Sequence, residues 1–399
     1  GEQGGPGGSF RTLPSSEALR DEKYNPRGLY NFRFEFGCGN NQNPKSGNGP
    51  SLPTFTTMNR EIRDSIDFAI LNGDWLYEEH RDYPLASWKE QLGIEGEAPR
   101  LVELAPTRVG VWENYKTYLA RAENLAEWHR HVPSYFTFDD HEIVNDVYGS
   151  GEVGRRDRRA VFRDPALAGW YDYLGWANPT VLPGDIHFGR AEFKAGSDIL
   201  SDPLAEFTKR DYRANSTLHV HWGGPHAGMA EFEYDAEPGD PNAGVYEIAE
   251  VLDANRLKIR PPARADGAAS YSIGRASHGS FRAANCEFYL LDTRTHSHMH
   301  DLREPAKAGV SMLGRPQVVW LKEAMQRSDA DFFFVVSSVN LMVPHVGAGG
   351  VEFDTQNKDD AWTTFLAERE ELIEFWDSRG KPVLVLTGDL HNSFAIKIT

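Results

Sequence analysis

The chain has 399 residues, of which 40% are hydrophobic and 25% charged, proportions that are ordinary for a soluble globular protein. Its formal net charge of −17 argues against nucleic acid and anionic lipid as partners, because phosphate groups are bound by basic surfaces. The sequence contains no apolar run of about 18 residues, the length that would span a membrane. Its two cysteines, Cys38 and Cys286, do not form a disulfide framework.

One unit recurs along the chain: an amphipathic helix, a short apolar strand and then a polar motif. Apolar residues at helical spacing begin the unit at 58–66, 111–129, 318–325 and 362–376. The strands that follow read DFAIL (67–71), PSYFTF (133–138), DFFFVV (331–336) and KPVLVL (381–386), and two more are FRFEFG (32–37) and CEFYLLDTR (286–294). Strands that do not alternate apolar and polar residues are typical of burial on both faces. We therefore predict an α/β fold with a parallel-rich sheet.

Residues from about 183 to 285 break this pattern. Helical periodicity disappears there, and Gly and Pro become frequent. The segment VYEIAEVLDANRLKI (245–259) is typical of a hairpin that turns at Asp253–Asn255. We interpret the whole range as a small β insertion.

Polar motifs follow the apolar strands at the points where the strands end. They are Asn72-Gly73-Asp74 with Tyr77, Asp139-Asp140-His141-Glu142, Asp292-Thr293-Arg294, Ser337-Ser338-Val339-Asn340 and Asp389-Leu390-His391. In parallel sheets ligands bind beyond the carboxyl ends of the strands. The sequence therefore predicts that these motifs gather into one site.

The acidic motif at 139–142 calls for a neutralising cation, because like-charged carboxylates raise each other's pKa. In an extended segment adjacent side chains point in opposite directions, so we do not expect Asp139 and Asp140 to line one site. We favour Asp140 as a metal ligand, with Asp139 or Glu142 as the partner that orients it. His141 would face a substrate oxygen as an acid or a charge stabiliser. The alternative is a solvated acidic loop.

The other motifs offer further metal ligands. Asp74 is a hard oxygen ligand able to bridge two cations, and a tyrosinate at Tyr77 would suit Fe(III); the alternative is a turn aspartate and a core tyrosine. Asp389 and His391 share a face if the segment is extended, so they could bind neighbouring metals; the alternative is a polar turn at a truncated terminus. Cys38 is either a thiolate ligand or a buried free cysteine.

Three other groups resemble sites but are better explained as ordinary structure. They are His219, His221 and His226; His296, His298 and His300; and the basic run Arg155–Arg159. Neither histidine group has a carboxylate or Cys at a matching turn, and the arginines fit a solvated helix face. Arg294, at a strand end beside the predicted site, is the better candidate for binding phosphate.

Taken together in this order, the motifs resemble a known family. Cys38, GDWLYE (73–78), DDHEIVND (139–146), FYLLDTR (288–294), SMLGRPQVVWLKEAM (311–325) and TGDLHNS (387–393) resemble the alkaline phosphatase D (PhoD-like) family of metallophosphoesterases. The resemblance implies an α/β fold of the four-layer αββα sandwich type, with a catalytic domain over residues 30–399 and the β insertion at about 183–285. Residues 1–29 would be a linker or the remnant of an upstream β domain. Because the chain opens GEQGGPGGSF without an initiator Met and stops soon after His391, we expect that it is trimmed.

The same resemblance implies the chemistry. Family members hydrolyse phosphate monoesters and diesters with iron and calcium, by a metal-activated hydroxide. Matched residue by residue, Fe(III) would be held by Cys38, Asp74, Tyr77 and His391, and Ca²⁺ by Asp74, Asp140 and Asp389. His141 would sit against the phosphoryl group, and Arg294 remains the candidate phosphate contact. The resemblance also implies a small phosphate-ester substrate and export from the cytoplasm.

Two other functions fit parts of the pattern. A calcium-binding protein without catalytic activity would need the acidic residues but not Tyr77 or His391. A glycosidase could use Asp140 and Asp389 as paired carboxylates, and it would need no metal. The particular ester and the oligomeric state are not indicated by the sequence.

Overall fold

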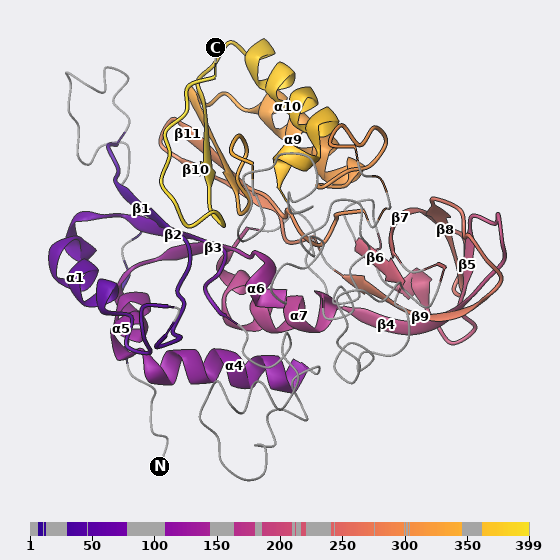
Figure 1. The fold of residues 1–399 in the computed structure, drawn as a ribbon, viewed down its shortest axis with the longest axis horizontal. Helices are drawn as coiled ribbons and strands as arrows, with labels where there is room; N and C mark the ends of the chain where they lie inside the picture. Colours follow the sequence, from indigo (N-terminus) through magenta and orange to yellow (C-terminus); the bar gives the residue numbers. More distant parts are fainter. Residues whose placement is uncertain are drawn as a thin grey trace, which may run out of the picture.

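The computed structural model describes most of the chain. The described residues are 7–10, 12, 30–45, 47–77, 108–143, 163–179, 186–209, 212, 217–220, 241–242, 244–274, 276–298, 300, 302, 304–344 and 361–398. Within them the chain forms a three-stranded sheet, a four-stranded sheet and a closed barrel, accompanied by helices (Figure 1). No helix in this described part is long and apolar enough to cross a membrane.

The first sheet is built from the N-terminal third of the chain. Its strands β1 (Phe34–Gly37), β2 (Phe68–Asn72) and β3 (Ser134–Thr137) lie side by side and run parallel. The accompanying helices are α1 (Pro53–Glu61), α4 (Arg108–Arg121), α5 (Glu123–His131), α6 (Asp140–Ile143) and α7 (Arg163–Tyr173). The three strands expected here from apolar runs are confirmed.

The second sheet is built from the C-terminal third. Strands β11 (Cys286–Leu290), β12 (Phe332–Ser337) and β13 (Val383–Thr387) run parallel, as expected, and are accompanied by α9 (Arg315–Arg327) and α10 (Leu366–Ser378). A further strand, β10 (Gly279–Ala283), pairs antiparallel with β11. It lies inside the range that we assigned to the insertion. Because Phe281 is paired with Phe288 across a tight hairpin, this segment joins the second sheet instead.

The two sheets pack face to face through aromatic side chains. Phe68 of β2 and Phe288 of β11 are buried with ring centroids 5.7 Å apart, and Phe288 also stacks on Phe281 at 4.7 Å. The next residues along β2, Ala69 and Leu71, face away into a second core formed with α4, α5 and α7. Burial on both faces explains the unbroken apolar run of β2. Each fully buried Phe side chain stabilises the folded state by about 1.5–3 kcal/mol.

The range that we interpreted as an insertion contains a barrel of six antiparallel strands. The strands are β4 (His187–Phe193), β5 (Ile199–Ser201), β6 (Thr217–Val220), β7 (Gly244–Val251), β8 (Arg256–Arg260) and β9 (Gly267–Gly274), closed in the order β4-β5-β8-β7-β6-β9. The expected hairpin at Asp253–Asn255 joins β7 to β8. Side chains such as Phe193, Leu257 and Tyr271 are buried in its core, so the barrel is a packed unit. It lies beyond α7 at one side of the molecule (Figure 1).

The carboxyl ends of the two parallel sets of strands meet. At the end of β2, the Asn72 side chain donates from Nδ2 to the backbone oxygen of Ser337, at the end of β12, over 2.9 Å. Asn72 Oδ1 accepts from the Thr137 hydroxyl at 2.7 Å. One buried amide thus joins β2, β3 and β12. The loops that follow these strands are held together at one edge of the two sheets, where the polar motifs lie.

Candidate metal centre

Asp74 reaches the site through a tight turn after β2. Gly73 and Asp74 both have left-handed backbone conformations, with φ of 75° and 53°. A Cβ on Gly73 would lie 2.6 Å from the Cβ of Asp139, so a larger residue would not fit. The turn therefore places the buried Asp74 carboxylate directly beside the loop that follows β3.

A first group of metal-ligand atoms forms around Asp74. Asp74, Asp140 and His141 each offer an atom within 4.8 Å of the others. The Tyr77 hydroxyl donates to Asp74 Oδ2 at 3.2 Å and lies 3.2 Å from His391 Nε2. His391 Nε2 in turn lies 3.9 Å from Asp74 Oδ2. The structure thus brings together five residues that the sequence placed in the site.

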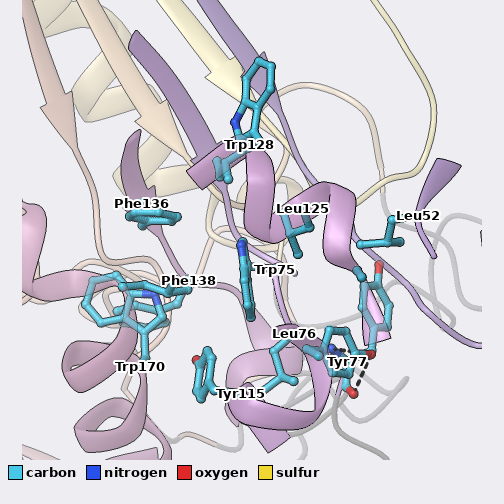
Figure 2. Packing of buried hydrophobic residues seen from close by; sticks show 14 of the residues in the cluster. Leu52, Trp75, Leu76, Tyr77, Tyr115, Leu125, Trp128, Phe136, Phe138 and Trp170 are labelled. Carbon is cyan, nitrogen blue, oxygen red and sulfur yellow. Dashed lines mark hydrogen bonds between the residues drawn. The ribbon is translucent and has the colours of Figure 1, made fainter. Parts of the chain in front are cut away.

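The local core holds Tyr77 in this position. Its backbone N–H donates to the Tyr118 hydroxyl at 3.0 Å, and that hydroxyl donates to the Tyr77 carbonyl at 2.9 Å. Figure 2 shows Trp75 and Leu76 among the buried side chains of the same cluster, with Tyr77 beside them. The Tyr77 ring also lies 4.0 Å from the His141 ring, centroid to centroid. Apolar packing therefore fixes one side of the first group.

A second group of ligand atoms adjoins the first. Asp139, Asp140 and Asp389 offer oxygens that lie within 4.8 Å of one another, so Asp140 belongs to both groups. We expected that Asp139 and Asp140 would not line one site, and this is wrong. Strand β3 ends at Thr137 and α6 begins at Asp140, so the chain turns between the strand and the helix. Because the segment is not extended there, the carboxylates of Asp139 and Asp140 do not point in opposite directions.

The backbone conformation at Asp389 and His391 differs from the extended one that we expected. Both residues have left-handed conformations, with φ of 68° and 53°, where an extended segment was expected. Asp389 joins the carboxylates of the second group, while His391 lies beside Tyr77 and Asp74 at the edge of the first. The two side chains therefore lie at neighbouring groups, but they do not reach them from one face of an extended strand.

Cys38 lies at the rim of the site. Its loop is tied to the turn after β2, because Asn40 N–H donates to the Asp74 carbonyl at 2.7 Å. A Cβ on Gly388 would lie 3.1 Å from the Cys38 Cβ, so the loops after β1 and β13 are also in contact. Cys38 is free and exposed, and Cys286 is free and buried. Cys38 belongs to neither ligand group within the described residues.

Arg294 lies inside the site rather than at its surface. Only 1% of its side chain is exposed, and its Nε lies 2.5 Å from Asp139 Oδ1. Its Nη2 lies 3.9 Å from Asp140 Oδ1. The Ser338 hydroxyl donates to the same Asp139 oxygen at 2.9 Å. Arg294 and Ser338, which follow strands of the second sheet, therefore hold the carboxylate of Asp139, which follows a strand of the first.

The electrostatics of the site favour a bound cation. Burial raises the pKa of Asp74 and, more strongly, that of Asp139. The Asp74 carboxylate raises the pKa of His391. Within the described part of the chain, Asp74 Oδ1 and Asp139 Oδ2 are buried and have no hydrogen-bond partner. Oxygen atoms in such positions are what a metal ion would coordinate, and the oxygen and nitrogen donors present fit that role.

Sequence analysis included Asn72 and Ser338 among the polar motifs but did not single out Thr137, and it missed how these three residues join the loops. None of these three residues is in a ligand group. Asn72 and Thr137 link strands β2, β3 and β12, and Ser338 holds Asp139. A signal for Asn72 was present, because it is a buried amide at the end of a wholly apolar strand. Its partners lie 65 and 265 residues away in sequence, so the pairing itself could not be read from the pattern.

The structure describes only part of the alternative histidine groups. His219 is buried in β6, while His221, His226 and Arg155–Arg159 lie outside the described residues. Burial lowers the pKa of His296 to about 3 and that of His298 to about 4. Neither these two nor His300 belongs to a metal-ligand group among the residues that the structure describes.

Comparisons with known proteins give a family match and a similar fold. The model of a family described as PhoD-like phosphatase matches residues 36–192 and 262–399, which include every site residue named above and omit most of the barrel. A solved structure described as "Structure of PhoD" is similar in fold, with a TM-score of 0.53 and 17% sequence identity. The similarity covers 96% of this chain but 54% of that one, so this chain spans about half its length. No match was found among curated proteins.

Proposed function

Because the chain belongs to the PhoD-like phosphatase family, we propose that it hydrolyses small phosphate esters, monoesters or diesters, at the metal centre described above. The observation that carries the proposal is the pair of adjoining ligand groups that share Asp140. Asp74 and Asp139 each leave one buried oxygen without a partner among the described residues, beside these same groups. A cluster of cations would neutralise all of these carboxylates at once.

We assign the ligands to two kinds of metal ion. Asp74, Tyr77, His391 and Cys38 would hold Fe(III), since phenolate, imidazole and thiolate donors suit a transition metal. Asp140 and Asp389, with Asp74 as the bridge, would hold Ca²⁺ through oxygen atoms. When bound, these ions would supply Lewis acidity that lowers the pKa of a water molecule and neutralises phosphoryl oxygens.

The chain's own residues would position and protonate the substrate. His141 belongs to the first group and packs on the Tyr77 ring, so its imidazole is held next to the metal ligands. We propose that it stabilises charge on the phosphoryl group or protonates the leaving oxygen. Arg294 contributes a positive charge beside Asp139 and Asp140, where it offsets carboxylate charge and favours an incoming phosphate.

We also propose the architecture and the cellular location of the protein. We propose a four-layer αββα sandwich for residues 30–399, supported by the core between the two sheets and by a further core on the outer side of each. The barrel would be an insertion in this domain, and residues 1–29 a linker or the remnant of an upstream domain. We further propose that the protein is exported, as the family resemblance implies.

Metal analysis of the purified chain tests the proposal directly. Elemental analysis and a visible absorption spectrum should show iron and calcium, with a charge-transfer band from Tyr77 to iron. Hydrolysis of p-nitrophenyl phosphate and of its bis-ester should then be lost on chelation and restored by the same metals. Calcium alone without turnover would favour a binding protein. Folded protein that is active without metal would contradict the proposal.

A further inference from the structure

Glu142 is a buried carboxylate whose oxygens are directed at backbone donors. It lies in α6 and is 1% exposed. Its Oε1 accepts the N–H groups of Trp75 at 2.6 Å and Leu76 at 3.3 Å. Its Oε2 accepts those of Asp74 at 3.1 Å and Asp139 at 2.8 Å. One side chain therefore holds the backbone of two separate loops.

These two loops carry the metal ligands. The loop after β2 supplies Asp74 and Tyr77, and the loop after β3 supplies Asp139 and Asp140. Asp74 also has a left-handed backbone conformation, which is unfavourable for a residue with a Cβ. A carboxylate that accepts the N–H of Asp74 and of the two residues after it holds this turn in its observed conformation.

Glu142 is not itself in either ligand group of the described residues. Its oxygens face backbone N–H groups, which a carboxylate can accept on both of its atoms. A glutamine at this position would place an NH₂ group opposite some of these donors, because an amide has only one acceptor oxygen. The arrangement thus requires a carboxylate, although Glu142 is in neither ligand group of the described residues.

We propose that Glu142 is a positioning residue that holds the two ligand loops at the separation needed for metal binding. The proposal rests on the proposed function, because it concerns the same metal centre. It adds that the spacing of Asp74 and Asp139 is set by the protein before a metal arrives. Mutation of residues that orient metal ligands without binding the metal typically lowers metal affinity by about 10- to 100-fold.

The chain offers a matched control for this role. Glu368, in α10, is also buried, and its Oε1 accepts the backbone N–H groups of Met312 at 3.2 Å and Leu313 at 2.9 Å. It belongs to neither ligand group in the described structure. Glu142→Gln and Glu368→Gln therefore make the same chemical change to a buried, backbone-binding glutamate, and only one of the two is at the metal centre.

The experiment compares metal affinity and backbone exchange in both variants. Each purified chain is stripped by chelation and titrated with Ca²⁺ and iron, and amide hydrogen exchange is followed at residues 74–76 and 139. Glu142→Gln should bind metal about 10- to 100-fold more weakly and exchange these amides faster. Glu368→Gln should keep wild-type affinity and exchange there, although its melting temperature should also fall.

Wild-type affinity and exchange in Glu142→Gln would overturn the proposal. If that variant does not fold, amide exchange in the metal-free wild type tests the proposal instead. Protected amides at Trp75 and Asp139 would support the proposal that Glu142 holds both loops before metal binds. Rapid exchange at these amides would contradict it. A wild-type chain that binds no metal would overturn the proposed function instead. The exchange measurement would still report whether Glu142 holds the two loops.

Discussion

Asp74 uses the two oxygens of one carboxylate differently. Its Oδ2 accepts from Tyr77 and lies near His391, while its Oδ1 is buried with no hydrogen-bond partner in the described part of the chain. Replacing one oxygen by an NH₂ group would remove a ligand atom and place a donor where a cation is expected. The side chain would keep its size, so the change is chemical and leaves the packing intact.

We expect Asp74→Asn to lower turnover by a factor on the order of 10² or more, because the bridging ligand is lost while the fold remains. Turnover of p-nitrophenyl phosphate and the circular dichroism melting curve measure the two effects. Asp64→Asn is the control, since that side chain is 82% exposed. Turnover close to wild type in Asp74→Asn would remove this residue from the metal centre.

His141 is the residue to which we assign charge stabilisation or proton transfer. His141→Ala should lower turnover by a factor on the order of 10² or more. An alkoxide is a poorer leaving group than p-nitrophenolate and depends more on protonation by the enzyme. The loss should therefore be larger for alkyl phosphate esters than for p-nitrophenyl phosphate. His131→Ala, a change at a histidine paired with Glu127 on the surface, serves as the control. An equal loss for both substrates would argue against proton transfer by His141.

Among the secondary-structure elements, the joint between the strands is the feature on which the site depends. Strands β2 and β12 come from different sheets, and the Asn72 side chain links their carboxyl ends. Removing it would leave the Ser337 carbonyl and the Thr137 hydroxyl buried without this partner. An unsatisfied buried polar group costs about 1–3 kcal/mol.

We therefore expect Asn72→Ala to lower the free energy of unfolding by about 1–3 kcal/mol or more, measured by chemical denaturation. Asn48→Ala, at an exposed loop position, should change it by less than about 0.5 kcal/mol. Loss of metal binding should accompany the destabilisation, since the loops after both strands carry site residues. A change at Asn72 as small as that at Asn48 would show that the sheets are held together elsewhere.

The sequence predicted elements better than it predicted contacts. Apolar runs identified β2 and β12 because both faces of each strand are buried, and the polar motifs after them do gather at one edge. The pairing of Arg294 with Asp139 joins residues 155 positions apart, so no local pattern encodes it. The left-handed conformations of Asp389 and His391 were missed because neither residue is a glycine, the usual signal for such a turn.

At the scale of the whole molecule, metal binding and stability should be linked. In the chain without metal, burial holds the pKa values of Asp74 and Asp139 above their ordinary value of 3.8. The folded state then keeps protons that the unfolded chain releases, so the contribution of these two groups to stability falls as the pH rises above about 4. Bound cations would remove this penalty, because they favour the ionised carboxylates.

The melting temperature should therefore rise on metal addition by an amount that grows as the pH is raised from about 4 towards neutrality. Differential scanning calorimetry of chelated and metal-loaded protein across this range gives the difference directly. In Asp74→Asn the growth should be smaller, since one of the two titrating carboxyl groups is gone. A stabilisation that is independent of pH would mean that these carboxylates do not bind the added ions.

The separation of the ligands along the chain has a consequence for how the protein is made. Tyr77 and His391 lie 314 positions apart, yet their side chains are in contact. While the ribosome is still synthesising the second sheet, the loop after β2 can present Asp74 and Tyr77, but His391, which lies beside both in the folded chain, has not yet been made. Non-local contacts of this kind also form late in folding. If Asp74, Tyr77 and His391 hold one ion, as we propose, that ion could gain all three ligands only in a chain whose synthesis and folding have both reached His391.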